Sequence, residues 1–283
     1  MSEYLKFKIE KRLKNRLGRV GVLETPNGKI ETPAFIIVGT KATVKSLTPE
    51  DILSLGGQAV LSNTYHLYLE PGDEIVRESG GLQKFMNWNG PTFTDSGGFQ
   101  AFSLGVAMKD KTNKFGIGVK KNYLGNCLSA DKICSLDIKV SDLEIQEDGT
   151  SICKDESESV LAKIDEEGVD FKSCIDGTMH RFTPERSMEI QHNIGADMIF
   201  AFDECTSPSA PYEYQKEAME RTHRWAKRSL ERHRELGGPI SLLGIVQGGR
   251  HEDLRKESAK FISSLDFDGF GIGGSFDKED VYN

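Results

Sequence analysis

Six short apolar and β-branched runs recur along the chain, and each ends at a glycine, an acid or an amide. They occupy residues 34–38, 59–63, 92–94, 197–202, 241–246 and 267–272. Nearly continuous apolar runs of this length are typical of parallel strands, because helices cover both faces of such a sheet. The pattern therefore predicts six parallel strands that alternate with helices.

Capping residues mark the helices between these runs. Thr48 and Pro49, followed by acids, predict the start of a helix that the glycines at 56–57 end. The same T-P-E pattern at 183–185 predicts a helix that Gly195 ends. Further helices are predicted near 73–79, from 212 to 236 and from about 252 to 264.

Two segments depart from this alternation. Residues 19–23 and 29–32 flank the turn-forming P-N-G at 26–28, which predicts an N-terminal antiparallel hairpin. Residues from about 106 to 162 form a long insertion after the third strand, with lysines at its start and acids at its end. Such an insertion is either a lid, an arm that contacts nucleic acid, or a surface excursion.

Strand and helix order favours a (β/α)8 TIM barrel of which about six βα units are present. A doubly wound open sheet is the alternative, but no G-x-G-x-x-G follows the first strand. We expect residues 1–283 to form one incomplete TIM-barrel domain that carries the insertion at about 106–162.

Composition narrows the class of protein. No apolar run approaches the roughly 18 residues of a membrane span, and the first residues lack a signal-peptide pattern, so we expect a cytoplasmic protein without a membrane partner. The net charge of −8 means that a nucleic-acid partner would need a local basic surface. The five cysteines lack C-x2-C spacing, so we expect no metal site among Cys127, Cys134, Cys153, Cys174 and Cys205.

Polar residues suited to one planar ligand follow the third to sixth strands. A carboxylate accepts hydrogen bonds, an amide donates and accepts, and glycine N–H groups donate. Guanine fits such a set: Asp203 would accept its N1–H and amino N–H, Gln247 and the N–H of Gly274 would reach O6, and Phe99 would stack on the ring. The residue types permit guanine but do not by themselves identify it.

Four motifs at these strand ends resemble the tRNA-guanine transglycosylases, in that family's order. They are T-D-S-G-G-F-Q at 94–100, F-D-E-C-T at 202–206, G-I-V-Q-G-G at 244–249 and G-F-G-I-G-G at 269–274. S-N-T-Y-H-L at 62–67 supports the match. The resemblance covers nearly the whole chain outside the insertion.

The resemblance implies a glycosyltransferase that exchanges guanine at the tRNA wobble position for a 7-deazaguanine of the preQ1 type, in queuosine biosynthesis. It implies that Asp95 transfers a proton, and that tRNA, guanine and the 7-deazaguanine base are the partners, in a homodimer in the full-length form. The residues that match the family's substrate-binding positions are Asp95, Ser96, Gly97, Gly98, Phe99, Asp203, Gln247 and Gly274.

Two features of the family have no counterpart in the 283 residues. The family's nucleophilic Asp lies in a D-x-V/C-x-P-T-R strand, and its structural zinc is held by C-x-C-x-x-C and a His; neither pattern occurs here. We therefore expect a C-terminally truncated chain, without cofactor and inactive alone. The alternatives are a non-catalytic tRNA- or subunit-binding partner, and an unrelated barrel lyase or metal hydrolase that uses His66, His180 or His192 with Asp95.

Overall fold

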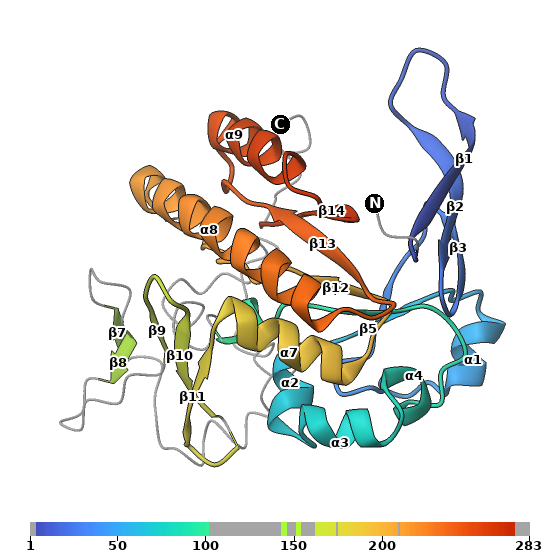
Figure 1. Ribbon diagram of the computed structural model, residues 1–283, viewed down its shortest axis with the longest axis horizontal. Coiled ribbons are helices and arrows are strands. Elements are labelled where there is room, and N and C mark those ends of the chain that lie inside the picture. Colours follow the sequence, from blue (N-terminus) through green and yellow to red (C-terminus); the bar gives the residue numbers. More distant parts are fainter. Residues whose placement is uncertain are drawn as a thin grey trace.

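The computed structural model describes residues 4–101, 143–145, 151–153, 162–173, 175–208 and 210–274. Its central element is a six-stranded parallel sheet with the order β14-β13-β12-β6-β5-β4 (Figure 1). The strands are β4 (Ile37–Val38), β5 (Val60–Ser62), β6 (Thr92–Thr94), β12 (Met198–Phe200), β13 (Ser241–Val246) and β14 (Gly269–Ile272).

All six predicted strands are confirmed, and each one pairs with the strand that comes before or after it in this set. A doubly wound sheet reverses its strand order at a switch point, and this order has no reversal. Within the described part of the chain, β4 and β14 are the two edges and do not pair with each other. The sheet therefore runs in the sequential order of a barrel wall without closing.

The predicted caps form where the sequence places them. The Thr48 side chain accepts a hydrogen bond from the Asp51 N–H, and the Asp51 carboxylate accepts one from the Thr48 N–H, which closes a capping box. Thr183 caps its helix through the Arg186 N–H, and Gly195 ends that helix with φ of 74°. In the described part of the chain, residues 98–101 are helical, and the helices with both ends described are α1 (Pro49–Ser54), α2 (Thr64–Leu69), α3 (Asp73–Glu78), α4 (Leu82–Phe85), α7 (Pro184–Ile194), α8 (Tyr212–Leu236) and α9 (Glu252–Ser263).

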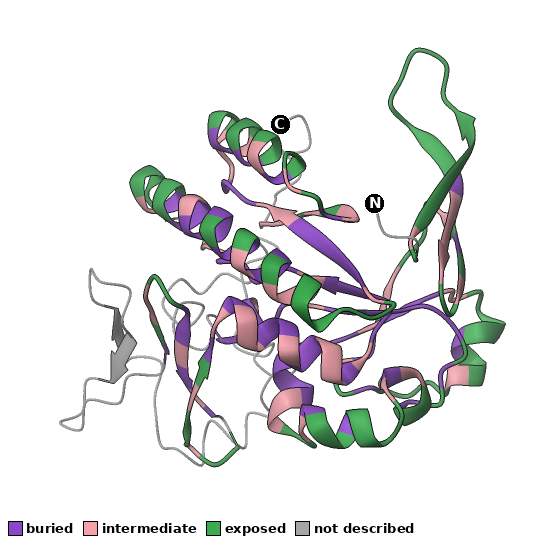
Figure 2. Ribbon diagram, viewed as in Figure 1, coloured by how far each residue is buried: buried purple, intermediate pink, exposed green. Residues whose placement is uncertain are grey.

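Both faces of the sheet are buried, which explains its nearly continuous apolar strands. Ile199 and Leu242 pack in a core under the helices, whereas their neighbours Met198 and Leu243 join Phe93 in a second core beneath the N-terminal strands. Helices α7, α8 and α9 lie in a row, and α8 and α9 contact β13 (Figure 1). Buried positions therefore follow the strands and the inner faces of these helices (Figure 2).

The N-terminal hairpin is confirmed and is part of a larger sheet. Strands β2 (Arg19–Thr25) and β3 (Gly28–Thr32) pair as predicted, and β1 (Lys6–Arg12), which the sequence analysis did not predict, pairs with β2. The turn between β2 and β3 is fixed to the amino end of β12, where the buried Asp197 carboxylate accepts hydrogen bonds from the Asn27 N–H at 3.1 Å and side-chain amide at 2.9 Å.

A second antiparallel sheet follows the predicted insertion. It consists of β9 (Ala162–Ile164), β10 (Val169–Lys172) and β11 (Met179–Phe182), and the sequence analysis missed it. Of the insertion itself, most residues lie outside the described ranges, and β7 (Leu143–Ile145) pairs with β8 (Ser151–Cys153). Among the described helices, none has the length and apolar character needed to cross a membrane.

Candidate active site at the carboxyl ends of the strands

Three predicted base-recognition residues meet at the carboxyl ends of β6, β12 and β13. The Asp203 carboxylate accepts a hydrogen bond from the Ser96 hydroxyl at 2.8 Å and another from the Gln247 amide at 2.7 Å. All three side chains are buried. A buried carboxylate needs such donors, because an ionised group without partners is costly away from water. The structure thus brings together residues that lie 44 and 107 positions apart.

Asp95 lies one residue before Ser96, and its carboxylate has a separate set of partners. It accepts hydrogen bonds from the Thr64 N–H at 2.8 Å, the Asn63 amide at 2.5 Å and the Gln100 amide at 3.0 Å. Three donors from two segments hold the carboxylate in one orientation. The site therefore contains two carboxylates with different surroundings. Asp95 is bonded by residues between β5 and α2, and Asp203 is bonded by a residue that follows β13.

Asn63 and Gln100 occur within the matched motifs of the sequence but were not predicted to have a role in the site. Asn63 directly follows β5, as Asp95 directly follows β6. A search for polar residues at the carboxyl ends of the strands would therefore also have found Asn63. Gln100 follows Asp95 by five residues, at the start of the helix that includes residues 98–101. Its contact with Asp95 depends on the turn at Gly97 and Gly98, which the sequence pattern does not define.

Glycines allow the close packing of this site. A Cβ on Gly98 would lie 2.7 Å from the backbone oxygen of Asp203, and one on Gly273 would lie 2.6 Å from the amide nitrogen of Gln247. Gly97 and Gly274 have φ of 80° and 110°. The predicted glycines therefore line the same place as the polar residues, and any side chain at 98 or 273 would displace Asp203 or Gln247.

Phe99, the predicted stacking residue, is half-buried and follows Gly98 at the start of the helix. Its ring is thus on the segment that carries Asp95 and Ser96. The stacking role remains a prediction.

Helix α9 fixes the loops that follow β13 and β14. The Arg255 guanidinium donates hydrogen bonds to the carbonyl oxygens of Gly249 at 3.3 Å and Gly273 at 3.1 Å, and burial lowers the pKa of Arg255. The Gln247 N–H donates to the Ser258 hydroxyl at 3.0 Å. The contact with Ser258 fixes the Gln247 backbone, and the Gln247 side chain remains available to bond Asp203.

Glu204, next to Asp203, has its partners on helix α8. Its buried carboxylate accepts hydrogen bonds from the Arg221 guanidinium and from the Tyr214 hydroxyl, the latter at 2.7 Å. Burial raises the pKa of Glu204 above its ordinary value, although Arg221 acts in the opposite direction. The Glu204 N–H also donates to the Thr222 hydroxyl at 3.0 Å. The segment that carries Asp203 is thus anchored to α8.

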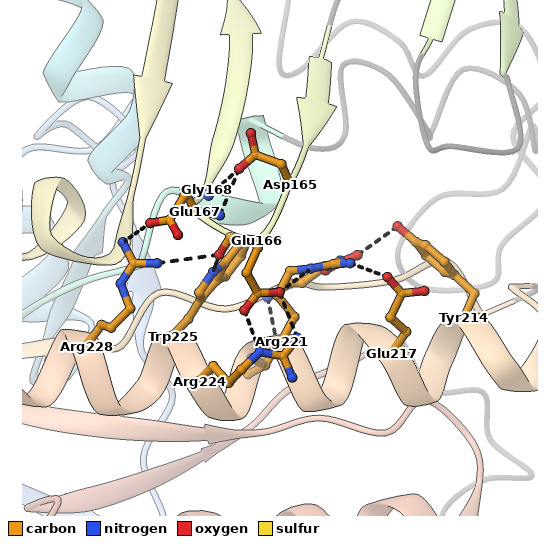
Figure 3. Close-up of polar contacts among 12 residues, drawn as sticks. Asp165, Glu166, Glu167, Gly168, Tyr214, Glu217, Arg221, Arg224, Trp225 and Arg228 are labelled. Atoms are coloured by element: carbon orange, nitrogen blue, oxygen red, sulfur yellow. Dashed lines mark hydrogen bonds and ion pairs between the residues drawn. The ribbon is translucent and has the colours of Figure 1, made fainter.

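The same helix holds the turn between β9 and β10 (Figure 3). Arg224 pairs with the Glu166 carboxylate, the Trp225 indole N–H donates to the Glu166 carbonyl at 2.7 Å, and Arg228 pairs with Glu167 at 3.1 Å. Arg221 lies between Glu166 and Glu217 in this view. Through Arg221, the antiparallel sheet β9–β11 and the strand end that bears Asp203 share one ion-pair network.

The histidines of the alternative enzyme class have other surroundings. Tyr68 and Thr178 hydrogen-bond the two nitrogens of His180, and His192 hydrogen-bonds His233. His66 is buried, and this burial lowers its pKa. In the part of the chain that the structure describes, no three His, Cys, Asp or Glu side chains gather as a metal site. Of the five cysteines, the side chains of Cys127, Cys134, Cys153 and Cys174 lie outside the described residues.

Comparison with known proteins agrees with the motifs. The family model described as queuine tRNA-ribosyltransferase matches residues 14–140 and 150–282. Proteins named queuine tRNA-ribosyltransferase from Desulforamulus reducens and Thermoanaerobacter sp. strain X514 are 44% and 42% identical over 95% of this chain. One from Staphylococcus aureus strain bovine RF122 is 42% identical over 90% of it. The matches span 58%, 57% and 53% of those relatives' own lengths, respectively.

Proposed function

Because the chain belongs to the queuine tRNA-ribosyltransferase family, we propose that the protein exchanges guanine in tRNA for a 7-deazaguanine of the preQ1 type. The exchange takes place at the wobble position of the anticodon, in queuosine biosynthesis. The observation that carries this proposal is the buried Asp203 carboxylate, which Ser96 and Gln247 hold at the junction of three strand ends.

Guanine recognition follows from the donors and acceptors of that junction. Guanine presents N1–H and an amino group on one edge, and Asp203 is the acceptor that we assign to both. An amide NH2 carries two N–H groups; Gln247 directs one to Asp203, and we assign the other to guanine O6. The Gly274 N–H is a second donor for O6, and Phe99 covers the ring. Adenine lacks the N1–H and O6, so this set rejects it.

Asp95 is the proton-transfer residue in this proposal. In a retaining exchange, one carboxylate attacks C1′ of the ribose, the C1′–N9 bond breaks, and guanine leaves with the bonding electrons and gains a proton. The incoming base then loses its N9 proton as that nitrogen forms the new bond to C1′ and the carboxylate leaves. Asp95 donates the first proton and accepts the second, and the amides of Asn63 and Gln100 keep its carboxylate in place.

The attacking carboxylate is not among the residues that we assign. We further propose that the six strands belong to a (β/α)8 barrel and that the protein acts as a cytoplasmic homodimer. None of the residues that we assign is a ligand of the family's structural zinc, so no step depends on it. A non-catalytic tRNA-binding partner is the alternative.

Incorporation of radiolabelled guanine into tRNA tests the proposal. The protein should label a tRNA with guanine at the wobble position and leave the same tRNA with adenine there unlabelled. Label in neither tRNA, together with retained tRNA binding, would favour the non-catalytic partner. Equal labelling of both would contradict guanine recognition.

A further inference from the structure

Strand β1 and the connection from it to β2 are strongly basic. We name residues 6–19 the basic ribbon; they comprise β1, the connection to β2 and the first residue of β2. The ribbon carries seven basic residues against the single acid Glu10, in a chain whose net charge is −8. The basic residues are Lys6, Lys8, Lys11, Arg12, Lys14, Arg16 and Arg19.

The ribbon is exposed to solvent on both faces. Every residue of β1 is exposed, and the ribbon projects away from the parallel sheet (Figures 1 and 2). Among the residues that the structure describes, none of its seven cations pairs with a carboxylate; Glu24, beside them, pairs with Lys29 instead. Lys29, and more weakly Lys6 and Lys8, lower the pKa of Glu24, which reports the positive field at this end of the sheet. The charge is thus available to an external partner.

The strands β2 and β3 that carry the ribbon are anchored to the core, so the ribbon has a fixed attachment to the parallel sheet. Leu23 of β2 packs against the second core, and Ile30 of β3 is buried in it. The β2–β3 turn is hydrogen-bonded to Asp197 at the amino end of β12. The candidate active site lies at the carboxyl ends of the parallel strands. A partner bound to the ribbon would therefore bind away from that site.

We propose that the basic ribbon binds the phosphate backbone of the tRNA substrate, at a part of the tRNA other than the anticodon. The inference rests on the proposed function, which already requires a polyanion larger than the pocket. Lys6 and Lys8 stand at alternate positions of β1, about 7 Å apart on one face. The irregular register between Ile9 and Lys11 sets Lys11 opposite Val20, two residues from the partner of Lys8, so Lys11 continues this row. An extended row of cations suits a row of phosphates. Phe7, 42% exposed with Arg19 over its ring at 5.6 Å, adds a surface on which an unpaired base can stack.

The test is the salt dependence of tRNA binding by the protein with Lys11, Lys14 and Arg16 all changed to Gln. Each phosphate contact contributes about 0.7–0.9 to the slope of log K against log salt, so the slope should fall by about 2. The matched control changes three exposed lysines elsewhere, Lys84, Lys216 and Lys260, to Gln. It should leave the slope within about 0.5 of that of the unaltered protein.

Guanine affinity and guanine exchange at saturating tRNA separate this inference from the proposed function. Both should be unchanged in the ribbon variant. A wild-type slope in that variant would overturn the inference while leaving the proposed function intact, whereas absent exchange in the unaltered protein would overturn the proposed function. Loss of binding to phosphatidylserine vesicles without loss of tRNA binding would assign the ribbon to a membrane surface and also overturn the inference.

Discussion

Replacing Asp95 with asparagine should slow guanine exchange into tRNA about 10²- to 10⁴-fold, the usual contribution of a positioned proton-transfer group. The amide cannot accept the N9 proton, and its NH2 would face the amide donors of Asn63 and Gln100. Affinity for free guanine should change much less, because Asp203 and Gln247 make the assigned base contacts. The measurement is the initial rate of labelled-guanine incorporation at saturating tRNA and guanine.

The control for that variant is Asp170→Asn, which changes a carboxylate that pairs with Arg181 on β11. Its exchange rate should match that of the unaltered protein. An Asp95→Asn protein that retained a near-normal rate would remove Asp95 from the chemistry. A variant that lost guanine affinity as strongly as rate would instead show that Asp95 mainly maintains the pocket.

Replacing Asp203 with asparagine should weaken guanine binding about 30-fold or more and leave adenine binding almost unchanged. Two assigned hydrogen bonds from guanine would be lost or inverted, at about 1–3 kcal/mol each. The new NH2 group would also face the donors of Ser96 and Gln247, which now approach the carboxylate. Calorimetric titration with each base measures both affinities.

Ser96→Ala is the matched comparison, because it removes one donor to Asp203 and keeps the carboxylate. Its guanine affinity should fall by about tenfold at most, the loss of one ordinary hydrogen bond. An equal loss of guanine and adenine binding in Asp203→Asn would mean that Asp203 supports the fold instead of reading the base.

Local signals were sufficient to predict the framework of this protein. Thr48 and Thr183 start helices because their side chains accept hydrogen bonds within one turn, and Gly195 ends one because glycine adopts positive φ at little cost. The apolar runs became strands because both faces of the sheet are covered. Such features depend on neighbours in sequence or on overall burial, so one sequence is enough to find them.

Features that depend on distant partners were missed. Strand β10 alternates Val169 and Phe171 inward with polar residues between them, but its role as the middle strand depends on partners on both sides. The partners of Glu204 were not predictable either, because Tyr214 and Arg221 lie on helix α8, 10 and 17 positions away. Asn63 contacts Asp95 across 32 positions, and only the register of β5 beside β6 brings them together.

The most direct test of the guanine-site assignment is an experimental structure of the protein with guanine bound. We expect guanine at the carboxyl ends of β6, β12 and β13, with N1–H and the amino group on the Asp203 carboxylate, O6 on the Gln247 amide and the ring against Phe99. Guanine bound elsewhere, or bound there with its N1–H edge turned away from Asp203, would contradict the assignment.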